Sequence, residues 1–182
     1  MTPGMWYAAR AAGIVAWLLV TASVVWGLLL STRLTTVRPA RWMLDLHRFL
    51  GGLAVTFTAV HVAALVADTY VHFGAADVLL PFASRWRPGA VALGVVGMWL
   101  LAAVELTSLL MRRLPRRAWR AVHMSSYGLY ALATLHGVTA GSDLRGPLGS
   151  VGVEASAAVV LFLSLVRVLS PKPARRPAAR TA

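Results

Sequence analysis

The sequence predicts an all-α protein, a polytopic membrane helix bundle with five transmembrane helices. Of its 182 residues, 58% are hydrophobic and only 13% are charged, which is too apolar for an ordinary soluble domain. The apolar residues gather into stretches of about 20, long enough to cross the hydrocarbon core of a bilayer, and the basic residues gather between those stretches. We therefore expect a multi-pass protein of the cell (plasma) membrane, in contact with membrane lipids.

Five apolar stretches give the expected helices, at residues 11–30, about 47–68, 89–111, 119–141 and 151–168. The first is longer than the apolar region of a typical secretory signal, and no small-x-small cleavage site follows it, so we expect it to be retained.

The connections and the tail also have distinct compositions. They are a basic loop over 31–46, a segment over 69–88 expected to lie in the membrane interface, and a turn-rich loop over 141–150. We expect one membrane domain over 1–170, followed by a basic, disordered cytoplasmic tail over 171–182.

The distribution of basic residues predicts the orientation of the chain. Fourteen of the 18 Lys and Arg residues belong to the first loop with the adjoining Arg48, to the third loop with the adjoining Arg120, to the end of the last helix or to the tail; the other four are Arg10, Arg85, Arg87 and Arg145. Because cytoplasmic loops carry the excess of basic residues, we expect the N-terminus outside and the C-terminus in the cytoplasm. The helices at 47–68 and 119–141 then run parallel, and both start at the cytoplasmic side.

The composition also excludes several classes of function. The chain has no cysteine, which rules out disulfides, zinc ribbons, iron–sulfur clusters and thiol catalysis. The net charge of +12 does not indicate a nucleic-acid-binding protein, because the basic residues lie between apolar stretches rather than over a water-facing fold. We therefore expect no nucleic-acid partner, and any bound metal must use His, Asp, Glu or Met.

Four of the five histidines lie within two of the expected helices and form the candidate site. His47 and His61 are 14 residues apart on one helix, and His123 and His136 are 13 apart on another, so each helix separates its histidines by about 20 Å along the axis. Because the two helices are expected to be parallel, His47 and His123 share the inner level and His61 and His136 share the outer level.

An imidazole in hydrocarbon needs a partner, and an iron porphyrin can supply one. Intramembrane histidines are functional candidates by default, and a haem held by two axial imidazoles has apolar faces that suit a helix bundle. We therefore expect two b-type haems, with His47 and His123 as iron ligands of one and His61 and His136 of the other. A haem-free membrane transporter or structural subunit is the alternative.

Helical geometry supports this interpretation for the first histidine helix. Fourteen residues turn through about 1400°, close to four full turns, so His47 and His61 project from one face. Gly51, Ala54 and Thr58 lie between them on that face, where small side chains leave room for a macrocycle.

The second histidine helix is less regular. Thirteen residues leave His123 and His136 about 140° apart in azimuth on an ideal helix. Either the helix is distorted near Ser125, Ser126 and Gly128, as Gly and Ser permit, or the two haems approach it from different directions.

Two further residues are weaker candidates. His72 lies just beyond the outer end of the helix at 47–68, where an interface histidine is expected and an external substrate or metal contact is the alternative. Glu105 lies about two turns inside the cytoplasmic end of the helix at 89–111. We expect it to be a snorkelling acid paired with a nearby Arg, with a proton or quinone site as the alternative.

The histidine pattern resembles that of a known family. The H-x13-H on one helix, the H-x12-H on the next but one, and the segment WRAVHMSSYGLYALATLHG are similar to the ferric-reductase-like transmembrane domain. Ferric reductases, NADPH oxidases and the haem-binding membrane subunit of the periplasmic methionine sulfoxide reductase system share this domain. The resemblance covers about residues 11–170. It implies that the first histidine of each helix binds the inner haem and the second one the outer haem.

The resemblance also implies a function. We expect a b-type dihaem membrane protein that transfers electrons from a cytoplasmic flavoprotein or quinol donor to an extracytoplasmic acceptor, such as a periplasmic or extracellular redox partner. A terminal ferric-chelate or oxygen reductase acting near His72 and Trp86 is the alternative. The chain has no Gly-rich dinucleotide fingerprint and ends soon after its last helix, so we expect FAD and NAD(P)H to be bound by a separate molecule. Family members often have six helices, and we expect the first of these to be absent here.

Overall fold

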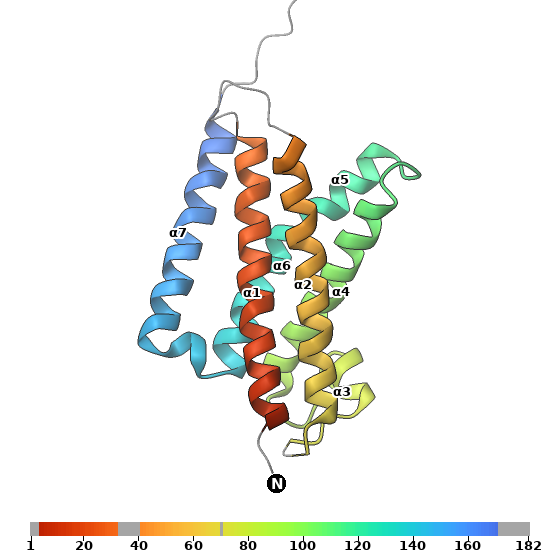
Figure 1. The fold of residues 1–182 in the computed structure, drawn as a ribbon, viewed down its shortest axis with the longest axis vertical. Coiled ribbons are helices and arrows are strands. Elements are labelled where there is room, and N and C mark those ends of the chain that lie inside the picture. Colours follow the sequence, from red (N-terminus) through yellow and green to blue (C-terminus); the bar gives the residue numbers. More distant parts are fainter. Residues whose placement is uncertain (1–3, 33–40, 70, 171–182) are drawn as a thin grey trace, which may run out of the picture.

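Long apolar helices dominate the computed structural model, which describes residues 4–32, 41–69 and 71–170. Within these ranges the regular structure is entirely helical, as the composition predicts. Four helices are long and apolar enough to cross a membrane: α1 (Gly4–Ser31), α2 (Arg41–Ala67), α4 (Pro88–Leu109) and α7 (Pro147–Leu169). They extend along the long axis of the molecule (Figure 1), and they correspond to four of the five predicted spans.

The remaining predicted helix is divided into two pieces, α5 (Arg116–Met124) and α6 (Ser126–Ala140), which meet at Ser125. There the Ser125 hydroxyl donates to the carbonyl oxygen of Val122 at 2.6 Å, and the Ser125 N–H points to the same oxygen at 3.0 Å. Back-bonding by a serine bends or interrupts a helix, so the structure contains the distortion that the sequence offers as one alternative. Neither piece has the about 20 residues of a complete span, and the five-span topology stays a prediction.

The first connection is shorter than predicted. We expect a loop over 31–46, but α2 begins at Arg41, so the prediction is wrong for residues 41–46. The reason is packing against α1: the Trp26 indole donates to the carbonyl oxygen of Met43 at 2.8 Å, and its ring lies 5.8 Å from that of Trp42. This contact holds the first turn of α2 in place. Residues 33–40 and the predicted tail at 171–182 lie outside the described residues.

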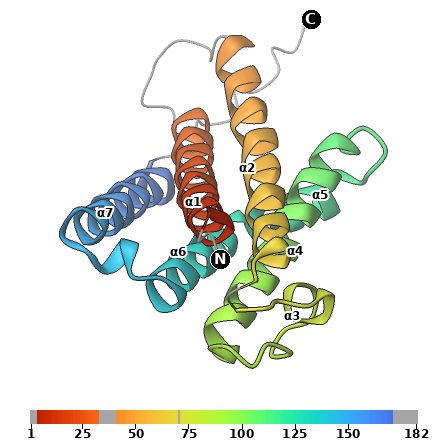
Figure 2. The same cartoon turned by 60° about the horizontal axis from the view of Figure 1, so that its bottom comes forward.

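The segment predicted to lie in the membrane interface contains one short helix, α3 (Ala75–Leu79). Gly74 precedes it, and the Gly74 N–H donates to the Asp77 carboxylate at 2.8 Å, which satisfies a free group at the helix start. The Trp99 indole of α4 donates to the carbonyl oxygen of Leu79 at 3.0 Å. Figure 2 shows this segment folded beside the beginning of α4.

The bundle has two ends that differ in charge. We call the N-terminal end the one that holds Gly4, residues 71–87 and residues 141–146, and the C-terminal end the one that holds Ser31, residues 110–115 and Leu169 (Figure 1). Exposed arginines gather at the C-terminal end, at positions Arg41, Arg48, Arg112, Arg113, Arg116, Arg117, Arg120 and Arg167. The predicted orientation, with this end in the cytoplasm, rests on that asymmetry.

An apolar core joins α1, α2, α4, α6 and α7. Its buried members are Val20, Leu28, Ala54, Leu101, Leu129, Tyr130, Val160 and Leu163. Polar side chains lock two of the contacts: the Trp17 indole of α1 donates to the Thr134 hydroxyl of α6 at 3.0 Å, and the Tyr130 hydroxyl lies 2.7 Å from that of Ser156 on α7. These contacts position α6 against α1 and α7.

Candidate functional site

The structure brings the four intramembrane histidines together as two pairs. Helix α2 carries His47 and His61, α5 carries His123, and α6 carries His136. The ring centroids of His47 and His123 are 6.0 Å apart with an interplanar angle of 76°. Those of His61 and His136 are 6.3 Å apart at 79°. These are the partners that the predicted topology places at the same levels.

The spacing within each pair fits two imidazoles on opposite sides of one iron. Metal–imidazole nitrogen bonds are about 2 Å long, and about 1.2 Å separates a ring nitrogen from its ring centroid, so two trans axial imidazoles place their centroids about 6.4 Å apart. The observed 6.0 and 6.3 Å lie close to this value. A haem iron would need only two protein nitrogens, because the porphyrin would supply its other four ligands.

Three of the histidines have one ring nitrogen engaged by a helix that carries no member of the pairs. Their Nδ1 atoms lie within hydrogen-bond distance of backbone carbonyl oxygens. The distance is 2.7 Å from His61 to the oxygen of Ala9, 2.8 Å from His136 to that of Ala90 and 3.1 Å from His47 to that of Ser23. Because a carbonyl oxygen can only accept a hydrogen bond, each of these Nδ1 atoms carries the proton. In the neutral ring Nε2 then has a lone pair that can bind a metal. Metal-bound histidines typically donate their second nitrogen in this way.

His123 is held differently from the other three. Its Nδ1 lies 3.5 Å from the Ser108 hydroxyl of α4, and within the described ranges no backbone carbonyl accepts from this ring. Its ring stacks on Trp119, with centroids 5.1 Å apart and an interplanar angle of 22°. An aromatic neighbour and a side-chain hydroxyl therefore orient this ring.

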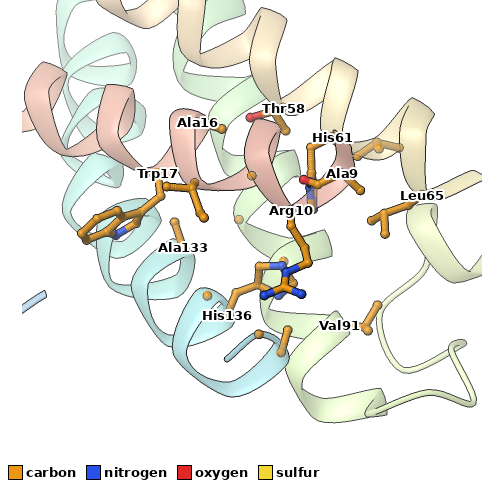
Figure 3. A pocket seen from close by; sticks show the side chains of 18 of the residues that line it. Ala9, Arg10, Ala16, Trp17, Thr58, His61, Leu65, Val91, Ala133 and His136 are labelled. Atoms are coloured by element: carbon orange, nitrogen blue, oxygen red, sulfur yellow. Dashed lines mark hydrogen bonds between the residues drawn. The ribbon is translucent and has the colours of Figure 1, made fainter. Parts of the chain in front are cut away.

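A cavity of about 350 Å³ lies beside the His61/His136 pair, between α1, α2, α4 and α6. Figure 3 shows the two histidines entering it from α2 and α6, with Arg10 beside them. Its walls are mostly apolar, and three arginines also line it: Arg10, Arg87 and Arg145. An apolar chamber with cationic groups suits a flat, apolar ligand that bears anionic substituents.

Arg10 and Arg87 are held by contacts with the loop and the helix end that close the cavity. Arg10 donates to the Asp143 carboxylate, with Nε 2.9 Å from the nearest oxygen, and this bond holds the pKa of the Asp143 carboxyl below its ordinary value. Arg87 donates to the carbonyl oxygens of Thr139 and Ala140 at 2.8 and 3.1 Å, at the end of α6.

The small residues predicted to face a macrocycle have different surroundings. Thr58 lines the cavity, as expected. Ala54 is only 1% exposed and belongs to the apolar core, and Gly51 lies directly against the Glu105 carboxylate. Among the described residues Glu105 has no ion pair, so the expected Arg partner is not found there.

His72 does not belong to either pair. It is exposed, and its backbone has a positive φ of 57°. Other groups contact the histidines or the cavity without being evident from the sequence pattern. They are the carbonyls of Ala9, Ser23 and Ala90, the Ser108 hydroxyl and the salt bridge of Arg10 with Asp143. The paired spacing on α1, where Ala9 and Ser23 are 14 residues apart as His47 and His61 are, is the signal that could have pointed to them.

Among the residues that the structure describes, no group of three or more His, Asp or Glu side chains gathers to hold a bare metal ion. The imidazoles of this part of the chain gather as the two pairs described above. In combination with the four long apolar helices, they belong to a multi-pass membrane protein with a site inside the bundle.

Comparison with known proteins places the chain in a family. No match was found among curated proteins or among solved structures. A sequence model described as the ferric reductase like transmembrane component matches residues 12–134, a range that contains His47, His61 and His123 and stops just short of His136. Such a domain indicates electron transfer in a membrane. The match covers more than half of the chain, which therefore belongs to the family of ferric-reductase-like transmembrane components.

Proposed function

We propose that this protein is a b-type dihaem component that carries electrons across the membrane. The observation that supports this most is the presence of two histidine pairs whose ring centroids lie 6.0 and 6.3 Å apart. The proposed ligands are His47 and His123 for one haem and His61 and His136 for the other. When bound, each haem supplies a one-electron carrier whose potential is set by its axial ligands and its burial.

The histidines act as ligands rather than as acids or bases. Each of the three that donate to a backbone carbonyl has a fixed tautomer, with Nε2 available for the iron. The donated hydrogen bond makes the imidazole a stronger electron donor and prevents the ring from rotating. Both effects would hold the two rings in place as ligands while a bound haem iron gains or loses an electron.

The cavity beside His61 and His136 favours a porphyrin over a smaller ligand. Its apolar walls would exclude water from the faces of a macrocycle, and Arg87 and Arg145, together with Arg10 and its partner Asp143, would hold two propionates. Arg145 donates through Nε to the Gly141 carbonyl oxygen at 3.2 Å. All three guanidinium groups also hold protein oxygens, which keeps this end of the cavity ordered.

The direction of transfer follows from the proposed orientation. Electrons enter at the C-terminal end, in the cytoplasm, from a separate flavoprotein or quinol, and they leave at the N-terminal end to an extracytoplasmic acceptor. The exposed arginines around α5, including Arg116, Arg117 and Arg120, favour a donor with an acidic face. A periplasmic or extracellular redox protein is the proposed acceptor.

The test is a dithionite-reduced minus oxidised spectrum of the purified protein, combined with a haem assay. We expect b-type bands and two haems per chain, and a preparation reconstituted with haem that shows neither would refute the proposal. Vesicles loaded with a cytoplasmic-side donor then separate transmembrane transfer from terminal reduction. A carrier reduces an added redox protein, whereas a terminal reductase consumes a ferric chelate or oxygen without one.

A further inference from the structure

The helices that support the histidines repeat one short pattern. Each carbonyl that accepts a histidine N–H is followed four residues later by a glycine, and we call these the carbonyl–glycine pairs: Ala9 with Gly13, Ser23 with Gly27, and Ala90 with Gly94. Two of the pairs lie on α1 and one lies on α4. Neither helix carries a proposed haem ligand.

Helix geometry explains why a glycine is needed at that place. Side chains of a helix tilt toward its N-terminus, so the side chain of residue i+4 stands beside the carbonyl of residue i. An imidazole that reaches this carbonyl must pass through the space of that side chain. Only glycine leaves the path open.

The distances show that the path is filled by the histidine rings. A Cβ atom added at Gly94 would lie 2.7 Å from Cε1 of His136, and one added at Gly13 would lie 2.9 Å from Nδ1 of His61. At Gly27 the distance to Cε1 of the His47 ring would be 3.1 Å. The first two distances are shorter than a real Cβ atom shows to a neighbouring side chain, so these rings pack directly against bare backbone.

The register of α1 matches that of α2. The two carbonyl–glycine pairs on α1 are separated by 14 residues, as are the two histidines of α2, and the two helices lie side by side (Figure 1). On α4 the residue 14 positions after Gly94 is Ser108, whose hydroxyl contacts His123 at 3.5 Å. The fourth histidine is thus the exception, because a side chain occupies the place of the glycine.

We propose that Gly13, Gly27 and Gly94 are positioning residues that fix the ring planes of the axial histidines. By admitting each ring to a carbonyl, they set the nearly perpendicular arrangement of 76° and 79° within the pairs. This inference rests on the proposed dihaem function. It adds that α1, which holds no haem ligand, determines the electronic state of both haems.

Electron paramagnetic resonance of the ferric protein reads the ring planes directly. Two perpendicular imidazoles donate equally to two iron d orbitals and leave them nearly equal in energy, which gives a strongly anisotropic low-spin signal, whereas parallel rings give a rhombic one. We expect the anisotropic type at both haems of the unaltered protein. Gly13→Ala and Gly94→Ala should change only the signal of the His61/His136 haem, and Gly27→Ala only that of the His47/His123 haem.

A potential titration is the second readout. Loss of the hydrogen bond to the carbonyl makes the imidazole a weaker electron donor to the iron, which stabilises the reduced form of the affected haem relative to the oxidised form. We expect the ratio of reduced to oxidised haem at a fixed potential to rise about tenfold, equivalent to about 59 mV for one electron, at the affected level alone. Gly52→Ala and Gly152→Ala are the matched controls, because an added Cβ meets nothing within 4 Å at the first and only Trp17 at 3.8 Å at the second.

The outcomes are distinct. A change or loss of haem confined to the predicted level supports the proposal, whereas unchanged signals and potentials, or an equal loss at both levels, overturn it. If the variants do not accumulate, the unaltered protein decides, since rhombic signals at both haems overturn the proposal and anisotropic ones support it. A protein that binds no haem refutes the proposed function itself and is recognised from the optical spectrum.

Discussion

Replacing one histidine should remove one haem and leave the other in place. The two pairs share no residue, so His61→Ala leaves a single imidazole, that of His136, at its level. The described contacts of the other pair, His47 and His123, are unaffected. We expect the purified variant to retain one haem per chain and the amplitude of its reduced minus oxidised spectrum to fall to about half.

Double variants make this prediction sharper, because the pairing decides which losses add. His61→Ala combined with His136→Ala should lose no more haem than either single change, since both act on one site. His61→Ala combined with His123→Ala should lose all of it. His72→Ala is the control, because this exposed histidine belongs to neither pair. The pairing is wrong if the first double variant is empty of haem or if the second keeps one haem.

Three further predictions concern the supporting structure, and unfolding in detergent measures all of them. Asp143→Asn should lower the free energy of unfolding by less than about 1 kcal/mol at neutral pH, because Arg10 and Asp143 are each about a third exposed. Because the pKa of this carboxyl is depressed in the folded protein, the ion pair stabilises the fold fully above the unfolded-state pKa of about 3.9, and its contribution is lost as the pH falls through the lower folded-state pKa. In acid the variant should therefore be as stable as the original protein, and a difference in unfolding free energy that persists there would contradict this. Tyr130→Phe, which removes a hydroxyl bond between α6 and α7, should cost about 1 kcal/mol, and unchanged stability would contradict this. Gly149→Ala should cost about 1–3 kcal/mol or more, because its Cβ would overlap backbone atoms of the preceding turn; Gly152→Ala is its control, and equal stability of the two would refute the close packing.

Much of the fold could be predicted from the sequence because the membrane imposes simple rules. A stretch of about 20 apolar residues has few alternatives to a helix in lipid, so the four long helices form where they are predicted. Their starts are less accurate: α1 begins at Gly4 rather than at 11, and α7 begins at Pro147, so the loop prediction is wrong for residues 147–150. The start of α2 could not be predicted, because it depends on the contact of Trp26 with Met43. The sequence marks Ser125 as a point where its helix can be distorted, but it does not decide between a distorted helix and haems that approach from different directions, because that depends on how the helix packs.

The candidate site was predictable in its members but not in its support. His47, His61, His123 and His136 are recognisable because imidazoles inside apolar helices are rare and costly, and their levels follow from the spacing. Their ligand role stays a prediction. The residues that orient them act through backbone carbonyls and through the absence of a side chain, and neither leaves a chemical mark in a single sequence. The sign of these residues in the sequence is the interval of 14 residues between Gly13 and Gly27, which equals the interval between His47 and His61.

The division at Ser125 separates His123 mechanically from His136. Because α5 has nine residues and no buried side chain, it can melt while α6 keeps its hydrogen-bond ladder. Amide hydrogens of α5 should therefore exchange with solvent faster than those of α6. His123, the ligand proposed at the side where electrons enter, would then lie on a segment that can open locally, whereas His136 would be held by the packed helix α6.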